Sequence, residues 1–157
     1  MSSPGGWPEL ARSAIEEYRS GRLRSIIIVG YSTGAGSAIE MAAQLNAAKV
    51  PVNLVIKIDG TAAPPVPHNV RKLINVYVNG GYGNAIARPT DFLGTLQNIP
   101  VDGPNVDHYS IIDAKQAQLL NYVLAAAGSH APSSTGKSKR PTNAAAGTSE
   151  PGGQKPK

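Results

Sequence analysis

The sequence predicts a three-layer α/β domain, with a mostly parallel sheet of about four strands and flanking helices. Three observations lead to this prediction. Short aliphatic runs alternate with segments of helical periodicity, one run is an unbroken Ile-Ile-Ile-Val, and a glycine-rich turn joins that run directly to a helix. A length of 157 residues, with 41% hydrophobic and 16% charged residues, is typical of one globular domain.

The first half of the chain supplies a helix, a strand and a second helix. A helix is predicted from Trp7 to Ser20, because Pro8 suits the first helical turn and Gly21 follows as a stop signal. The aliphatic segment from Ser25 to Val29 predicts a strand covered on both faces, which we expect in the centre of the sheet. The second helix is predicted from Ala35 to Ala48.

The remaining elements follow the same alternation. Strands are predicted from Val52 to Ile58 and from Leu73 to Val78, and the short apolar patch from Ile99 to Val101 predicts a fourth. A final helix begins near Ser110 and Asp113, whose spacing is that of a capping box. The folded domain is therefore expected to span residues 1–128.

The last part of the chain, from Ser129 to Lys157, has a different composition. It contains no Val, Ile, Leu, Met or aromatic residue, so we expect a disordered basic tail. This tail carries five basic residues against one acidic residue, so most of the net charge of +5 lies there. Its cations are sparse and lack aromatic neighbours, so we expect no specific nucleic-acid binding.

Several kinds of site are excluded by composition. The chain has no cysteine, which excludes disulfides and thiolate zinc sites. His68, His108 and His130 have no metal-ligand spacing, so we expect neither a metal nor a cofactor, and we expect His68 and His130 to be uninvolved. The aliphatic run from Ile26 to Val29 is too short to span a membrane, and we expect a cytoplasmic location unless an export signal precedes the given sequence.

One turn carries most of the chemical information. Gly30, Tyr31, Ser32, Thr33 and Gly34 match G-x-S-x-G, between an apolar strand and a helix rich in small residues. A sharp strand-to-helix turn of this kind exposes the serine hydroxyl, and flanking glycines avoid Cβ clashes. Ser32 is therefore the candidate nucleophile, with the backbone N–H of Thr33 as an oxyanion donor.

A serine nucleophile needs a general base and a group that orients it. His108 lies in a polar loop after the last strand and is the candidate base. Asp59 ends the strand after the nucleophile helix and gives the chain order Ser, Asp, His, while Asp91 is the alternative acid. Asp107 is adjacent to His108 and so is poorly placed to orient its ring.

These residues resemble a known family. IIIVGYSTGAGSAIEMA, VNLVIKIDG, PHNVRKLINVYV and NVDHYSIID are similar to segments of small bacterial lipase-like and thioesterase-like members of the α/β-hydrolase superfamily, over Leu23 to Leu124. The resemblance implies that Ser32 is the nucleophile, His108 the base, Asp59 the acid and Thr33 an oxyanion donor. Many relatives have histidine where this chain has tyrosine before the serine.

The resemblance is to the C-terminal half of that fold, since relatives build several strands before the nucleophile strand. It implies that the strand of Ile26 to Val29 lacks a neighbour on one side, and that the loop supplying a second oxyanion amide is missing. We therefore expect a truncated N-terminus and a homo-oligomer or partner that covers the strand edge.

Three functions remain open from the sequence. The first is a serine hydrolase that cleaves a small ester or thioester through an acyl-enzyme, and the second is an inactive or partner-dependent hydrolase fragment. The third is a Rossmann-like dinucleotide-binding module, because Thr33 to Ser37 resembles a glycine turn and Asp59 lies 23 residues after Gly36. Ala38 and Glu40 stand where that motif needs glycines, which counts against this third function.

Overall fold

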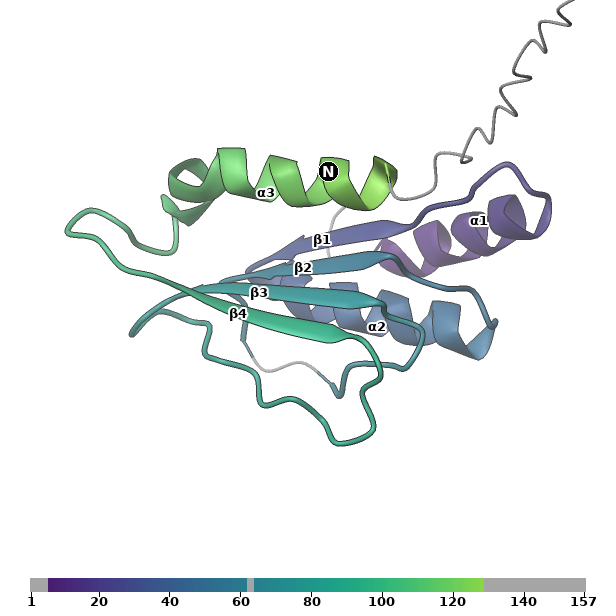
Figure 1. Cartoon of the computed structure of the whole chain (residues 1–157), viewed down its shortest axis with the longest axis horizontal. Helices are drawn as coiled ribbons and strands as arrows, with labels where there is room; N and C mark the ends of the chain where they lie inside the picture. The colour runs from purple at the N-terminus through teal and green to yellow at the C-terminus, as the bar shows by residue number, and fades with distance from the viewer. Residues whose placement is uncertain (1–5, 62–63, 129–157) are drawn as a thin grey trace, which may run out of the picture.

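A computed structural model of the chain, which describes residues 6–61 and 64–128, contains a single four-stranded sheet in the order β1-β2-β3-β4 with every pair parallel. The strands are β1 (Ile27–Tyr31), β2 (Leu54–Ile58), β3 (Lys72–Val78) and β4 (Thr95–Val101). The helices are α1 (Trp7–Arg19), α2 (Thr33–Ala47) and α3 (Ile111–Gly128). Helix α3 covers one face of the sheet and α1 and α2 lie on the other (Figure 1). The predicted three-layer α/β class is confirmed, and the predicted tail lies outside the described residues.

Each face of the sheet has its own hydrophobic core. On the side of α1 and α2, buried side chains of α2, including Ile39 and Leu45, pack against Ile28 and Leu73 of the sheet. On the side of α3, Ile111 packs with buried residues of β2 and β3. Strand β2 is buried at all five positions, because both cores meet on it.

The structure has no helix, within the described residues, long and apolar enough to cross a membrane.

The position of β1 differs from the prediction of a central strand. In the described part of the chain β1 pairs with β2 alone, so it forms an edge, as the family resemblance implied. Val29 is 53% exposed there, although aliphatic side chains precede it without interruption. The prediction of a central strand is wrong. An unbroken apolar run indicates that a strand avoids water, but it does not specify whether a second strand of the same chain pairs with its outer side.

Strand β4 is longer than the predicted Ile99 to Val101. Gln97 and Asn98 interrupt the apolar pattern, yet both pair in register with β3. Pro100 is compatible with this strand because β4 is the outer strand and a proline there does not remove a bond between two central strands.

The start of α3 is capped differently from the predicted Ser110–Asp113 box. The backbone N–H groups of Tyr109 and Ser110 donate to Asp107 Oδ1 at 3.0 and 2.9 Å. The Ser110 hydroxyl also donates to this oxygen at 2.8 Å. Asp107 therefore accepts the Ser110 N–H that a capping box would have given to Asp113. These bonds, of which the one from the Ser110 hydroxyl has the largest effect, hold the pKa of Asp107 below its ordinary value.

Candidate active site

The three polar residues singled out by the sequence meet at the carboxyl ends of the strands. Ser32 lies between β1 and α2, Asp59 directly follows β2, and His108 lies in the loop from β4 to α3. That loop is at the left of Figure 1, at the end of the sheet where parallel α/β proteins place working residues.

The turn at Ser32 has an unusual backbone. Ser32 has φ 55° and ψ −124°, a conformation that costs a non-glycine residue on the order of 1–3 kcal/mol. Two hydrogen bonds of 3.0 Å hold it, from Ser32 N–H to the carbonyl of Ile58 and from Ala35 N–H to the carbonyl of Ser32. The strained turn presents the serine side chain at the end of the sheet.

Only one of the two motif glycines is required by close packing. A Cβ atom at Gly30 would collide with the carbonyl of Gly34 and lie 2.8 Å from the Cα of Ala35. A Cβ atom at Gly34 would meet nothing within 4 Å, so the prediction that both glycines avoid clashes is wrong for Gly34. The second tight approach is at Gly60, where a Cβ atom would lie 2.6 Å from the carbonyl oxygen of Ser32. Nothing in the G-x-S-x-G pattern points to Gly60, because the approach joins two strand ends distant in sequence.

The side chains form a continuous hydrogen-bonded relay. The hydroxyl of Ser32 lies 3.1 Å from Nε2 of His108, and Nδ1 of His108 lies 2.8 Å from Oδ2 of Asp59. The His108 side chain is 12% exposed and that of Asp59 is fully buried. This is the order of groups that activates a serine hydroxyl in acyl transfer.

Asp59 is fixed by more than the histidine. Its Oδ1 accepts hydrogen bonds from the backbone N–H groups of Val78 and Gly83, at 3.1 and 3.0 Å. Burial by itself raises the pKa of Asp59, but the bonds from His108, Val78 and Gly83 outweigh burial and hold the pKa below its ordinary value. Asp59 is therefore an ionised acceptor with both oxygens in use. Its complete burial leaves no carboxylate for a ribose hydroxyl, which argues against a dinucleotide site.

Three of the six tyrosines surround the His108 ring. Tyr31 stacks on it at a centroid distance of 4.9 Å, and Tyr82 and Tyr109 meet it edge-on at 4.6 and 5.3 Å. The Tyr31 hydroxyl also donates to the backbone carbonyl of His108 at 2.6 Å. Burial, followed by the nearby Tyr109, raises the pKa of Tyr31, so the phenol stays a hydrogen-bond donor. The position where many relatives have histidine thus ties β1 to the histidine loop, a role that the motif alone did not reveal.

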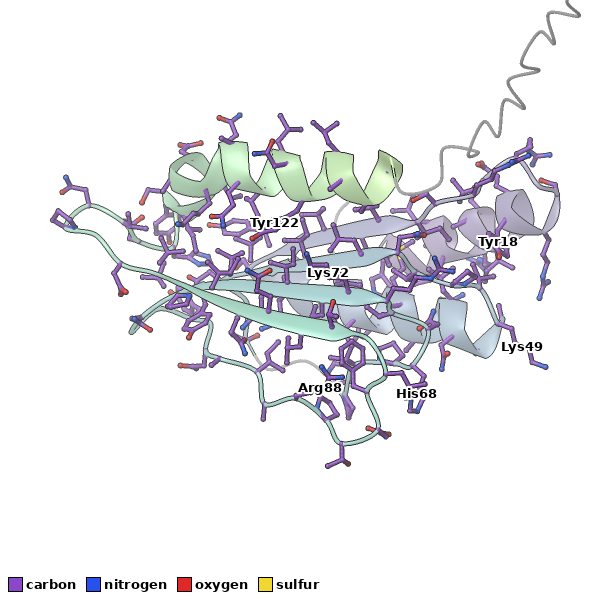
Figure 2. All side chains as sticks on the ribbon, viewed as in Figure 1. Tyr18, Lys49, His68, Lys72, Arg88 and Tyr122 are labelled. Carbon is purple, nitrogen blue, oxygen red and sulfur yellow. The ribbon has the colours of Figure 1, made fainter. Side chains whose placement is uncertain are left out.

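Asp91, the alternative acid, lies elsewhere. Its Oδ2 is 3.6 Å from Nε2 of His68, and its side chain is 71% exposed. Figure 2 shows His68 toward the opposite end of the sheet from the β4–α3 loop. The structure therefore does not bring Asp91 to His108. His130 lies outside the described residues, and no cluster of three or more metal-ligating side chains occurs within the described ones.

Two hollows flank the Ser32 turn. One, here called the edge groove, has a volume of about 870 Å³ and follows the open side of β1 past Val29 to Thr33 and Gly34. The other, here called the loop cavity, has a volume of about 500 Å³ and includes Gly60 and Tyr82 in its wall. Thr33 is the first residue of α2 and lines the edge groove, and its N–H has no acceptor within the helix.

Comparison with known proteins supports the fold. The chain is similar to the solved structure of the type II thioesterase BorB from the borrelidin biosynthetic cluster, with a TM-score of 0.50 and 12% sequence identity. The match covers 76% of this chain and 70% of the other. The fold is hydrolase-like. No protein-family model matches the chain. No curated protein sequence matches it either.

Proposed function

We propose that the chain is a serine hydrolase that cleaves a small ester or thioester through an acyl-enzyme on Ser32. The observation that carries this proposal is the relay from Ser32 Oγ to His108 Nε2 at 3.1 Å, and from His108 Nδ1 to Asp59 Oδ2 at 2.8 Å. The likeness in fold to a thioesterase adds support from outside the site.

In the proposed reaction, Ser32 Oγ attacks the acyl carbonyl while His108 Nε2 takes the hydroxyl proton. The carbonyl oxygen becomes an oxyanion that accepts a hydrogen bond from the N–H of Thr33 at the start of α2. His108 then gives the proton to the departing alcohol or thiol, which leaves the acyl group on Ser32. Water deprotonated by His108 then attacks this acyl-enzyme, the bond between the acyl carbon and Ser32 Oγ breaks, and His108 returns the proton to Ser32 Oγ as the acid leaves.

The same proposal assigns Asp59 the task of holding one tautomer of His108. A carboxylate with both oxygens engaged keeps the proton on Nδ1, so Nε2 is the acceptor that faces Ser32. Asp59 also stabilises the imidazolium that forms during the reaction.

The open edge of β1 supports a second part of the proposal. The edge groove is apolar, and in the described residues no strand pairs with the outer side of β1. We propose that a second copy of the chain covers this edge, because an unpaired apolar edge strand favours association.

Covalent labelling with a fluorophosphonate, followed by intact-mass measurement, tests the proposed nucleophile. The folded wild-type chain is expected to gain one adduct, and Ser32→Ala and His108→Ala are expected to gain none. Ser13→Ala, which changes an exposed serine on α1, serves as the matched control and is expected to label normally. A folded wild-type chain that stays unlabelled would contradict independent activity and favour the partner-dependent alternative.

A further inference from the structure

The loop cavity has a mostly apolar lining that contains one cationic side chain. It lies on the α2 side of the sheet, where the loops after β2 and after β3 take the place of a helix. Ile39, Val66 and Ile86 make it apolar, and Lys57 of β2 is the one cation in its described lining, which contains no carboxylate. A volume of about 500 Å³ is in the range of small-molecule sites.

This cavity adjoins the proposed nucleophile through two residues. Tyr82 lines the cavity and touches the ring of His108 at a centroid distance of 4.6 Å. Gly60 also lines it, and is pressed against the carbonyl of Ser32. The cavity therefore lies directly beside the proposed nucleophile, with Gly60 and Tyr82 shared between them.

Lys57 is a buried cation without an ion pair. Only 3% of the residue is exposed, and its Nζ donates to the carbonyl of Gly60 at 2.7 Å. No ion pair among the described residues includes Lys57. Asp59 attracts it, but both oxygens of Asp59 are already committed to other donors. An ammonium has three donors, so Lys57 has capacity for a further acceptor.

Burying the charged side chain of Lys57 without a counter-ion costs folding free energy. Burial lowers the pKa of Lys57 because the apolar surroundings disfavour its charged form, and the attraction of Asp59 opposes this only in part. A buried charge is normally paired, and an apolar side chain of similar length would pack here without that cost. An anionic group entering the cavity would supply the missing pair.

The far wall of the cavity is fixed in advance. Asn75 lies beside Lys57 in register and donates to the carbonyl of Asn84 at 2.8 Å and to Oδ1 of Asn98 at 2.9 Å. Asn98 in turn exchanges two hydrogen bonds of 2.9 Å with the backbone of Ile86. The buried amide of Asn75 and the partly buried amide of Asn98 thus anchor the loop that faces Lys57, so a ligand need not order that wall on binding.

We propose that the loop cavity binds an anionic oxygen group of the substrate, a carboxylate or a phosphate, through Lys57. The preferred substrates are then esters or thioesters that carry a negative charge on the part that enters the cavity. This proposal rests on the proposed function for its catalytic consequence, but the anion site itself is independent of Ser32.

The test compares 4-nitrophenyl hemiglutarate with the similarly sized neutral 4-nitrophenyl valerate. The wild-type chain is expected to favour the hemiglutarate in kcat/KM, and Lys57→Met is expected to reduce that preference about 10- to 100-fold, mainly through KM. Lys49→Met is the matched control, since Lys49 is exposed at the opposite end of the sheet (Figure 2). A third ester, 4-(butyryloxy)benzoate, carries the charge on the leaving half and identifies which half Lys57 contacts. Equal losses on charged and neutral esters in Lys57→Met would overturn the proposal and make Lys57 only a brace for Gly60.

A binding measurement separates this proposal from the proposed function. Calorimetry with Ser32→Ala is expected to detect glutarate or inorganic phosphate, whichever anion the site accepts, and Lys57→Met in the same background is expected to lose it. If an anion binds but the wild-type chain turns over no ester, the proposed hydrolase function is refuted and the proposed anion site is retained. Binding of neither anion would overturn the anion site. Should Lys57→Met not fold, competitive inhibition of the wild-type chain by glutarate, and none by dimethyl glutarate, gives the same answer.

Discussion

Replacing Asp59 with asparagine tests the relay at its most buried point. Oδ1 of Asp59 receives two backbone N–H groups and Oδ2 faces His108, so the oxygen of an asparagine is expected to take the Oδ1 position. Its amide nitrogen then points a donor at Nδ1 of His108. The ring must accept there and carry its proton on Nε2, where it faces the Ser32 hydroxyl and can no longer take its proton.

The wrong tautomer in such a relay costs about 10⁴ in kcat, or about 5.5 kcal/mol of transition-state stabilisation. The assay is kcat/KM for a 4-nitrophenyl ester, with circular dichroism to establish that Asp59→Asn is folded. Asp91→Asn is the matched control, because that exposed carboxylate contacts His68 instead, and it is expected to retain wild-type activity. A folded Asp59→Asn within tenfold of the wild type would refute this reasoning, and so would an equal loss in Asp91→Asn.

Three further outcomes are expected. Gly30→Ala should destabilise the chain by about 1–3 kcal/mol or more in urea unfolding, because its Cβ meets the backbone of α2, whereas Gly34→Ala has open space and should change stability little. Because the pKa of Asp59 is lower in the folded chain than the unfolded value of about 4, its ionisation stabilises the fold fully above that value, and this stabilisation is lost as pH falls through the folded pKa. Asp59→Asn should therefore flatten the dependence of thermal stability on pH in this acidic range. Val29→Lys should reduce self-association in sedimentation velocity, since it charges an exposed position on the open edge strand; unchanged association would exclude β1 as the contact.

The sequence predicted the α/β class and the order of elements because apolar periodicity reports local burial. It also placed Ser32, Asp59 and His108 each after a predicted strand, and parallel pairing of those strands brings the three residues to one end of the sheet. The apolar pattern alone placed β1 in the centre of the sheet, and only the family resemblance implied its edge position. The length of β4 was not predicted, because it depends on the pairing with β3. The sequence also could not decide whether Asp59 or Asp91 contacts His108, because that depends on how the loops fold in space.

The contacts around the relay were the least predictable. Gly60 and the N–H of Gly83 act through approaches between segments that are far apart in sequence. Tyr31 was visible only as a departure from a family pattern, and its bond to the carbonyl of His108 spans 77 residues. Lys57, Asn75 and Asn98 pair in register across three strands, but they appear in sequence as three isolated polar residues.

The relay also constrains when the chain becomes competent. Ser32 and its strained turn belong to β1 and α2, which are adjacent in sequence, whereas Asp59 and His108 are joined across 49 residues and Ser32 and His108 across 76. Loop closure over such distances costs entropy before the contacts repay it, so we expect the histidine loop to join the site late in folding. Recovery of fluorophosphonate reactivity during refolding is therefore expected to lag behind the recovery of helical signal, and simultaneous recovery of both would contradict this order.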